Sequence, residues 1–251
     1  MSYRRYWLAL AIVIIGSFAV LGTVGRKMIS QAPPIPDVYS PDGQLLFTGS
    51  SITDGQGVWQ SIGGQEIGTV WGHGAYVAPD WSADWLHRES EFLLNTWALR
   101  KGAANFASLD PDDQAILKAR LIREERTNTY DPANNRLVLS ADCVAAFQKL
   151  SAYYSDVFAS GRKEYGIPQG ALVDTAKQKK LTEFFWWAAW ATGTNRPGSD
   201  VTYTNNWPHE PLVGNNPTPG AVLWSIISVV ALIAGIGALV WWNSSREKEH
   251  I

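Results

Sequence analysis

The chain begins and ends with long apolar stretches, and the segment between them has apolar residues mostly at helical spacing. Residues 7–25 and 221–242 contain no charged residue. Each stretch can cross a hydrocarbon core of about 30 Å as a helix, because an α-helix rises about 1.5 Å per residue. Trp7 starts the first stretch, and Trp241 and Trp242 end the second, as is typical of a membrane interface. The pattern predicts two transmembrane helices.

A cleaved signal peptide is the alternative for the first stretch. Signal peptides have an apolar run of about 7–15 residues, followed by a small-residue cleavage site. Here the run is longer, and Arg26 and Lys27 come before any such site. We therefore expect residues 1–27 to be an uncleaved anchor.

The distribution of basic residues predicts the orientation of the chain in the membrane. Basic residues close to the spans are more numerous at the chain ends than on the side of the intervening segment, where only Arg26 and Lys27 are close. The positive-inside rule then places both termini in the cytoplasm. Residues 28–220 would form a periplasmic domain on a bacterial inner membrane, and 221–251 a second helix with a short cytoplasmic tail. The basic residues at the ends are Arg4, Arg5, Arg246 and Lys248.

Turn, cap and periodicity signals predict a mainly α-helical domain with a small β-hairpin between the spans. The Pro-rich residues 31–41 have no period, so we expect an extended connection from the membrane. Strands are expected at 44–48 and on both sides of a turn within 127–140. Helices are expected over 54–62 with Thr53 as N-cap, 84–101, 111–126 after Asp110, 141–159 after Ser140, and 175–191 after Asp174 or Thr175.

The last of these helices carries a dense aromatic run at 184–190 and is too short to cross a bilayer. We expect it to be a buried core helix or to pack on the membrane part. Residues 193–220 then form a loop that is long for a compact domain, and such loops often serve function or docking.

The stretch from Gly72 to Arg88 contains the densest group of special residues. Two glycines bracket His73, and Pro79 precedes a helical pattern, which predicts a shaped loop that leads into a helix. His73 and His87 are candidate ligands, as is His209, but an isolated histidine is more often a hydrogen-bonded structural residue.

Two acids in the same stretch allow a second interpretation. Asp80 and Asp84 lie one turn apart, so they could share a helix face as a catalytic pair. A helix cap and an acid in the first turn are the more common roles, and we expect those.

The sequence lacks the common signatures of cofactor and metal sites. There is no CxxC, CxxCH, HxxxH or HExxH motif, so neither a zinc site nor an attached haem is supported. Cys143 is the only cysteine, so no disulfide can form within the chain. GxGxxG and P-loop motifs are absent. The net charge of −2 gives no support for a nucleic-acid partner.

Ionisable residues inside a membrane span usually mark a proton path or a cofactor site. Neither apolar stretch contains such a residue. This favours anchoring and contact over chemistry in these helices. Small residues at 234–238 would let another helix approach closely, although ordinary glycine content of a membrane helix explains them equally well.

Three motifs of the chain resemble the N-terminal region of quinol-dependent nitric oxide reductases. They are WGHGAYVAPDWSADWLHRE at 71–89, FFWWAAWATGTNRPG at 184–198 and YTNNWPHEPLVGN at 203–215. The resemblance covers essentially the whole chain. It implies a transmembrane helix, a periplasmic cytochrome-c-like domain without haem c, and a second transmembrane helix. A twelve-helix catalytic core with haem b, haem b3 and a non-haem iron follows in this family, whereas this sequence ends at Ile251.

The resemblance also bears on haem attachment. In the cytochrome subunit of related enzymes, a CxxCH motif precedes a GEGAYFAP-like run. When that run is aligned on residues 72–79, the cysteine and histidine positions fall on Gly64, Ile67 and Gly68. The resemblance therefore implies a domain of this shape that carries no cofactor of its own.

In those relatives the same run helps to hold a calcium ion between this domain and the core, through a glycine backbone oxygen and a tyrosine. These correspond to Gly74 and Tyr76 here. Oxygen donors suit calcium, and the remaining ligands would come from the core.

We therefore expect the N-terminal module of a quinol-dependent nitric oxide reductase, which converts NO to N₂O in denitrification or NO detoxification. The chain would not be catalytic alone. Its expected partners are membrane lipid and a catalytic core of the haem–copper-oxidase type. The alternative is a non-enzymatic, membrane-anchored interaction protein derived from such a reductase. A third interpretation, an electron-carrying cytochrome, would require a haem.

Overall fold

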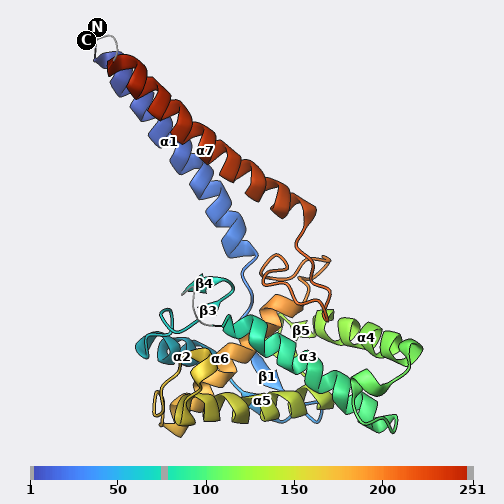
Figure 1. Ribbon diagram of the computed structural model, residues 1–251. Helices are drawn as coiled ribbons and strands as arrows, with labels where there is room; N and C mark the ends of the chain where they lie inside the picture. Colours follow the sequence, from blue (N-terminus) through green and yellow to red (C-terminus); the bar gives the residue numbers. More distant parts are fainter. Residues whose placement is uncertain (1–2, 75–78, 248–251) are drawn as a thin grey trace.

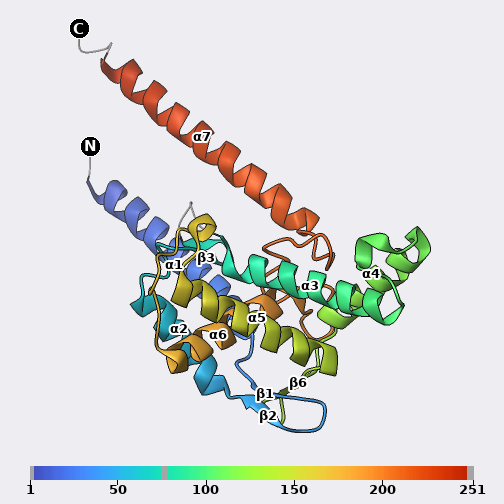
Figure 2. The same ribbon diagram turned by 60° about the horizontal axis from the view of Figure 1, so that its bottom comes forward.

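The computed structural model describes residues 3–74 and 79–247 and places a helical domain beside two long helices, α1 (Arg4–Ser30) and α7 (Pro219–Glu247) (Figure 1). Both helices leave the same side of the domain in both views (Figures 1 and 2), and their apolar windows have no residue buried by this chain. Each is long and apolar enough to cross a membrane. The predicted fold class, a mainly helical membrane protein with two end helices flanking an α-rich domain, is confirmed.

Side-chain caps start three helices of the domain at positions that the sequence predicts, with Asp174 chosen over Thr175 for the last. In each case a Ser or Asp oxygen accepts a backbone N–H of the first turn, which would otherwise have no partner. The capped helices are α4 (Pro111–Arg126) by Asp110, α5 (Ala141–Ser160) by Ser140, and α6 (Thr175–Gly193) by Asp174.

Helix α2 (Gly49–Ser61) begins earlier than predicted. Its N-cap is Thr48, whose hydroxyl accepts the Ser51 N–H at 3.3 Å. Thr53 lies inside the helix and donates its hydroxyl to the Gly49 carbonyl oxygen at 3.2 Å, so the prediction of Thr53 as N-cap was wrong. The Gly and Ser residues of the first turn are poor helix formers, which hides the true start.

A four-stranded sheet lies at the end of the domain away from the long helices (Figure 2). The hairpin expected within 127–140 is confirmed, and so is the strand at 44–48. A further strand in the Pro-rich segment was not predicted, because three residues are too few to show a two-residue alternation. It pairs in parallel with the distant strand at 136–138, whereas the other neighbouring strands pair in antiparallel fashion. The sheet order is β2-β1-β6-β5, with β1 (Asp37–Tyr39), β2 (Leu45–Phe47), β5 (Tyr130–Asp131) and β6 (Arg136–Val138).

Among the described residues, one long helix and four further short elements complete the domain. The long helix starts at Trp81 rather than at 84, because its cap is Asp80. A two-stranded sheet precedes it. The elements are α3 (Trp81–Arg100), β3 (Thr69–Val70) with β4 (His73–Gly74), and the one-turn helices η1 (Phe106–Ser108) and η2 (Lys163–Tyr165).

Helix α6 is the centre of the core. Residues 181–193 are all buried, and α2, α3 and α5 pack around them. A helix that is apolar on every side is stable only when it is enclosed. Phe185 stacks on Trp81 of α3, with ring centroids 5.2 Å apart and planes 5° from parallel. The prediction of a buried core helix is confirmed.

The connection from α1 to β1 is held against the core. The Trp187 indole N–H donates to the Pro34 carbonyl oxygen at 2.8 Å. Arg196, just beyond α6, donates to the Gln31 side-chain oxygen at 3.3 Å. The segment that leaves the first long helix is therefore fixed on α6.

Helices α2 and α6 come into backbone contact at Gly55. A β-carbon on Gly55 would lie 2.0 Å from the Lys180 carbonyl oxygen. That distance is too short for any side chain at position 55. Gly57 lies on the same helix, and a β-carbon there would meet nothing within 4 Å.

We expect Gly55→Ala to destabilise the protein by about 2–4 kcal/mol, because α2 must move away from α6 to admit a methyl group. Gly57→Ala is the matched control and should be neutral or stabilising by up to about 1 kcal/mol. Urea unfolding of the detergent-solubilised protein, followed by tryptophan fluorescence, measures both. Equal effects of the two substitutions would contradict the close packing.

Asp142 of α5 accepts hydrogen bonds from residues of both α3 and α4. Its carboxylate accepts the Trp97 indole N–H at 2.8 Å, a guanidinium N–H of Arg100 at 2.8 Å and one of Arg120 at 3.2 Å. The hydrogen bonds from Arg100, above all, hold the pKa of Asp142 below its usual value. A carboxyl group with a lowered folded-state pKa stabilises the fold above its unfolded pKa, and this contribution is lost as pH falls through the folded pKa.

Asp142→Asn should therefore cost about 1 kcal/mol of unfolding free energy at neutral pH, because Arg100 is largely exposed and solvent screens the pair. The difference from the parent protein should shrink below about pH 4, where the unfolded-state carboxyl group binds its proton. Urea titrations across this pH range test the prediction, with Arg100→Gln as the partner variant. A difference that stays constant down to pH about 3 would show that the charge of Asp142 is not responsible.

Candidate functional site

Asp80 organises the loop that leads into α3. One carboxylate oxygen accepts the N–H groups of Ser82 and Ala83, each at 3.0 Å, and caps the helix. The other accepts the Gly72 N–H and the Thr69 hydroxyl, each at 2.7 Å. Asp80 therefore fixes the β3–β4 turn onto the start of α3, which is the structural role that the sequence favours.

Asp84 belongs to a different network. Its carboxylate accepts the hydroxyl of Tyr154 at 2.6 Å, that of Tyr165 at 2.9 Å, and the Arg88 Nε–H at 3.0 Å. Burial, together with this carboxylate, raises the pKa of both tyrosines. Asp80 and Asp84 thus have separate partners, and they do not form a catalytic pair.

The structure does not bring the candidate histidines together. His73 and His209 are exposed. The Nδ1 atom of His87 lies 3.1 Å from a carboxylate oxygen of Glu210, and its Nε2 atom lies 3.5 Å from one of Glu91. Within residues 3–74 and 79–247, no histidine belongs to a group of three or more metal-binding side chains.

Of the two residues expected to bind calcium, Gly74 is described and Tyr76 lies outside the described residues. Gly74 pairs with Thr69 and has a φ of 139°, a conformation that favours glycine. A β-carbon there would lie 2.3 Å from the Gly68 carbonyl oxygen. The turn therefore depends on glycine at 74, and calcium binding stays a prediction.

Tryptophan rings fill the space beside two of the three positions aligned with the CxxCH motif. A β-carbon on Gly64 would lie 2.4 Å from the ring of Trp59, and one on Gly68 would lie 2.0 Å from Nε1 of Trp81. Both tryptophans are buried, at 4% and 0% exposure. Neither glycine has room for a side chain.

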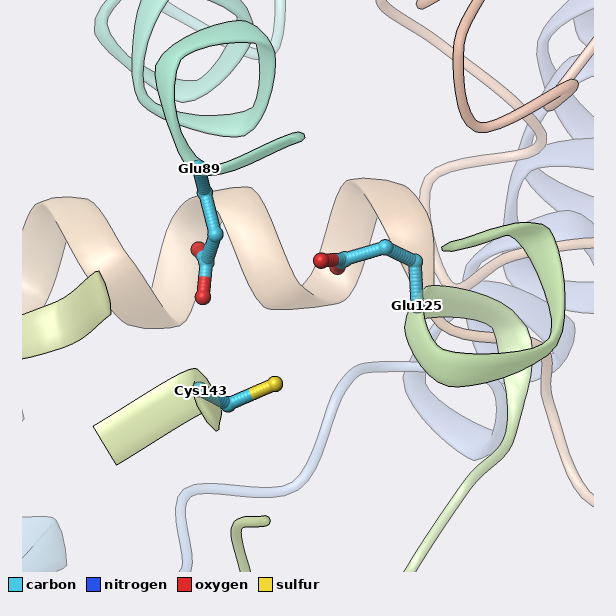
Figure 3. Close-up of side chains that lie close together, drawn as sticks. All are labelled: Glu89, Glu125 and Cys143. Carbon is cyan, nitrogen blue, oxygen red and sulfur yellow. The ribbon is translucent and has the colours of Figure 1, made fainter. Parts of the chain in front are cut away.

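The structure also contains a group of acidic side chains around a thiol, which no sequence motif marks as a site. Glu89 of α3, Glu125 of α4 and Cys143 of α5 point toward one another in front of α6 (Figure 3). Their ligand atoms all lie within 4.8 Å of one another. They line a cavity of about 60 Å³, to which Glu124 also contributes.

Burial governs the electrostatics of this group. It raises the pKa of Glu89 to about 7 and that of the Cys143 thiol well above its usual value. The pKa of Glu125 is also raised, first by burial and then by the charges of Glu89 and Glu124. Glu89 accepts the Trp85 indole N–H at 2.9 Å.

Comparison with known protein families decides the identity of the domain. Residues 36–209 match the family of the NorB cytochrome c-like domain of nitric oxide reductase. The chain belongs to this family. No curated relative matches the chain at a significant level. The family match covers most of the sequence, from β1 through the loop that follows α6.

In this nitric oxide reductase domain, the acidic group was not predicted from the sequence. The sequence nevertheless contains a signal that its two glutamates are buried. Glu89 lies four residues after Trp85 and four before Leu93, both of which are buried. Glu125 likewise lies four residues after the buried Leu121. An acid at a core position of a helical pattern is costly unless it has a partner or a function, so both glutamates could have been identified as special. What the sequence cannot supply is that the two helices place them together.

We expect Gly68→Ala to destabilise the cytochrome c-like domain by about 2–4 kcal/mol, because its methyl group overlaps the buried ring of Trp81. In a Trp81→Phe background the smaller ring leaves more room, so Gly68→Ala should cost less there than in the parent protein. The comparison is between the double variant and Trp81→Phe alone. Thermal unfolding followed by circular dichroism measures all three. Strictly additive effects would contradict a direct overlap.

Proposed function

We propose that this chain is the membrane-anchored N-terminal module of a quinol-dependent nitric oxide reductase. The observation that carries the proposal is the match of residues 36–209 to the NorB cytochrome c-like domain, between two helices long enough to cross a membrane. The reaction combines two NO molecules, two electrons and two protons into N₂O and water. It would take place in a core of the haem–copper-oxidase type, on a continuation of this chain or on a separate polypeptide.

The charge distribution supports an orientation for the module. Of the basic residues close to the spans, four lie at the chain ends and only Arg26 and Lys27 on the other side, so both termini lie in the cytoplasm of a bacterium and residues 28–220 in the periplasm. The two long helices leave the same side of the domain, which agrees with an even number of crossings (Figure 1). The domain then covers the periplasmic side of the core.

The apolar surfaces of the two long helices support lipid and the core as partners. Both are exposed along their length in the described residues. On α7, a β-carbon at Gly235 or Gly237 would meet nothing within 4 Å, so these positions are open to close approach by another helix. Helices of the core and membrane lipid would share these faces.

The domain docks, and it does not carry electrons. Trp59 and Trp81 occupy the space beside Gly64 and Gly68, which supports a fold that holds no haem c. Electrons would pass from the quinol to haem b and then to the haem b3–iron centre of the core. A calcium ion bound through the Gly74 backbone oxygen and Tyr76 would join the domain to that core.

Purification of the full protein from its native host in mild detergent should recover haem b and non-haem iron, and the preparation should reduce NO with a quinol as electron donor. Tyr76→Phe and calcium chelation should each weaken the docking about tenfold, because each removes part of the joint. The readout is the loss of haem-bearing core from the preparation or, for a continuous chain, a lower melting temperature.

His73→Ala is the matched control. It changes an exposed residue of the same turn that has no part in the calcium assignment, so docking should be unchanged. If His73→Ala and Tyr76→Phe weaken docking to the same extent, the proposed calcium site between the domain and the core is wrong. Recovery of the chain without haem, iron or NO reduction would favour the non-enzymatic interaction protein. A covalently attached haem in the preparation would favour the electron-carrying cytochrome.

A further inference from the structure

The group of Glu89, Glu125 and Cys143 is separate from the β3–β4 turn to which calcium binding is assigned. It has no role in the proposed function. Three helices contribute one side chain each, and α6 closes the group from behind (Figure 3). Glu89 is 5% exposed, and the carboxylate oxygen Oε1 of Glu125 is buried. The site is therefore built into the domain and is not a patch of surface acids.

The group has an excess of acidic side chains. Glu89, Glu124, Glu125 and Cys143 line the cavity, and no Lys, Arg or His is among its described lining residues. Buried carboxyl groups require compensation by a cation or by protons, because the interior solvates their charge poorly. The cavity of about 60 Å³ has room for an ion and a water molecule.

One oxygen aimed into the group has no partner. Oε1 of Glu125 makes no hydrogen bond to any described residue. Figure 3 shows this carboxyl group directed toward that of Glu89. An unsatisfied buried carboxylate oxygen is costly, and a bound cation would satisfy it.

We propose that Glu89, Glu125 and Cys143 bind one Zn²⁺ ion. A thiolate with carboxylates is a donor set that suits zinc, whereas calcium and magnesium take oxygen ligands only. Glu124, whose carboxylate lies 3.5 Å from the Cys143 sulfur, or a water molecule in the cavity completes the coordination. The ligands lie on three separate helices, which is why the sequence shows no zinc motif.

Binding has a defined proton balance and a defined structural effect. Cys143 loses its thiol proton to solvent and forms the S–Zn bond, and each glutamate releases any proton that it holds and binds as a carboxylate. The ligand atoms must draw together from their present spread of up to 4.8 Å, because zinc bonds are about 2.0–2.3 Å long. The ion would thus cross-link α3, α4 and α5 beside the core helix.

The test uses the full purified protein, stripped with a chelator and titrated with Co²⁺ and then with Zn²⁺. Cobalt should bind at one equivalent and give a thiolate charge-transfer absorption, which zinc removes and excess calcium does not. Zinc should raise the melting temperature of the parent protein. Cys143→Ser should abolish the thiolate band, and Glu89→Gln and Glu125→Gln should each weaken zinc binding by more than about 100-fold.

Glu91→Gln is the matched control, because Glu91 is exposed on the same helix as Glu89 and should leave binding unchanged. Absence of the thiolate band in the parent protein, or equal zinc binding by Cys143→Ser, would overturn the proposal. Greater stability of Glu89→Gln and Glu125→Gln without any zinc effect would overturn it in favour of a proton-neutralised pair. None of these outcomes depends on haem, calcium or a core partner, so the proposed function is tested separately.

Discussion

The enclosure of α6 over residues 181–193 is the constraint on which the rest of the domain depends. Its aromatic residues have no polar face to offer to solvent, so α2, α3 and α5 must surround it. Contact with α2 requires Gly55, since any β-carbon there would overlap the α6 backbone. Contact with α3 is made by the ring of Trp81, which stacks on Phe185 and at the same time fills the space beside Gly68.

The same packing bears on function. In this domain, tryptophan, tyrosine and phenylalanine side chains pack with aliphatic side chains in the interior, and the loop before α3 is held by Asp80. Under the proposed function, such a domain would offer its shape and surface to the catalytic core. The acidic group at Glu89 and Glu125 is a part of the interior whose chemistry packing does not explain, and a metal ion would give it a stabilising role.

Sequence patterns predicted the elements better than their assembly. The caps Asp110, Ser140 and Asp174 were identified because a side-chain oxygen before a helix acts locally. The start of α2 was missed because its glycine and serine residues carry no helical signal. Strand β1 was missed because three residues are too few to show a two-residue alternation and because one of its two partners, β6, is far away in the chain. The acidic group was missed for a related reason. Each glutamate is visible as an anomaly on its own helix, but their convergence depends on how three helices pack around α6.

The hydrogen bond from Trp187 to Pro34 has a mechanical consequence. A linker without contacts would let the domain swing freely relative to α1, whereas this linker is hydrogen-bonded to the core helix four residues after α1 ends. In a membrane, this contact would restrict how far the domain can turn relative to α1. Any partner of the domain would then meet it with its orientation relative to α1 already restricted, and the rotational search during assembly would be smaller than for a loosely tethered domain.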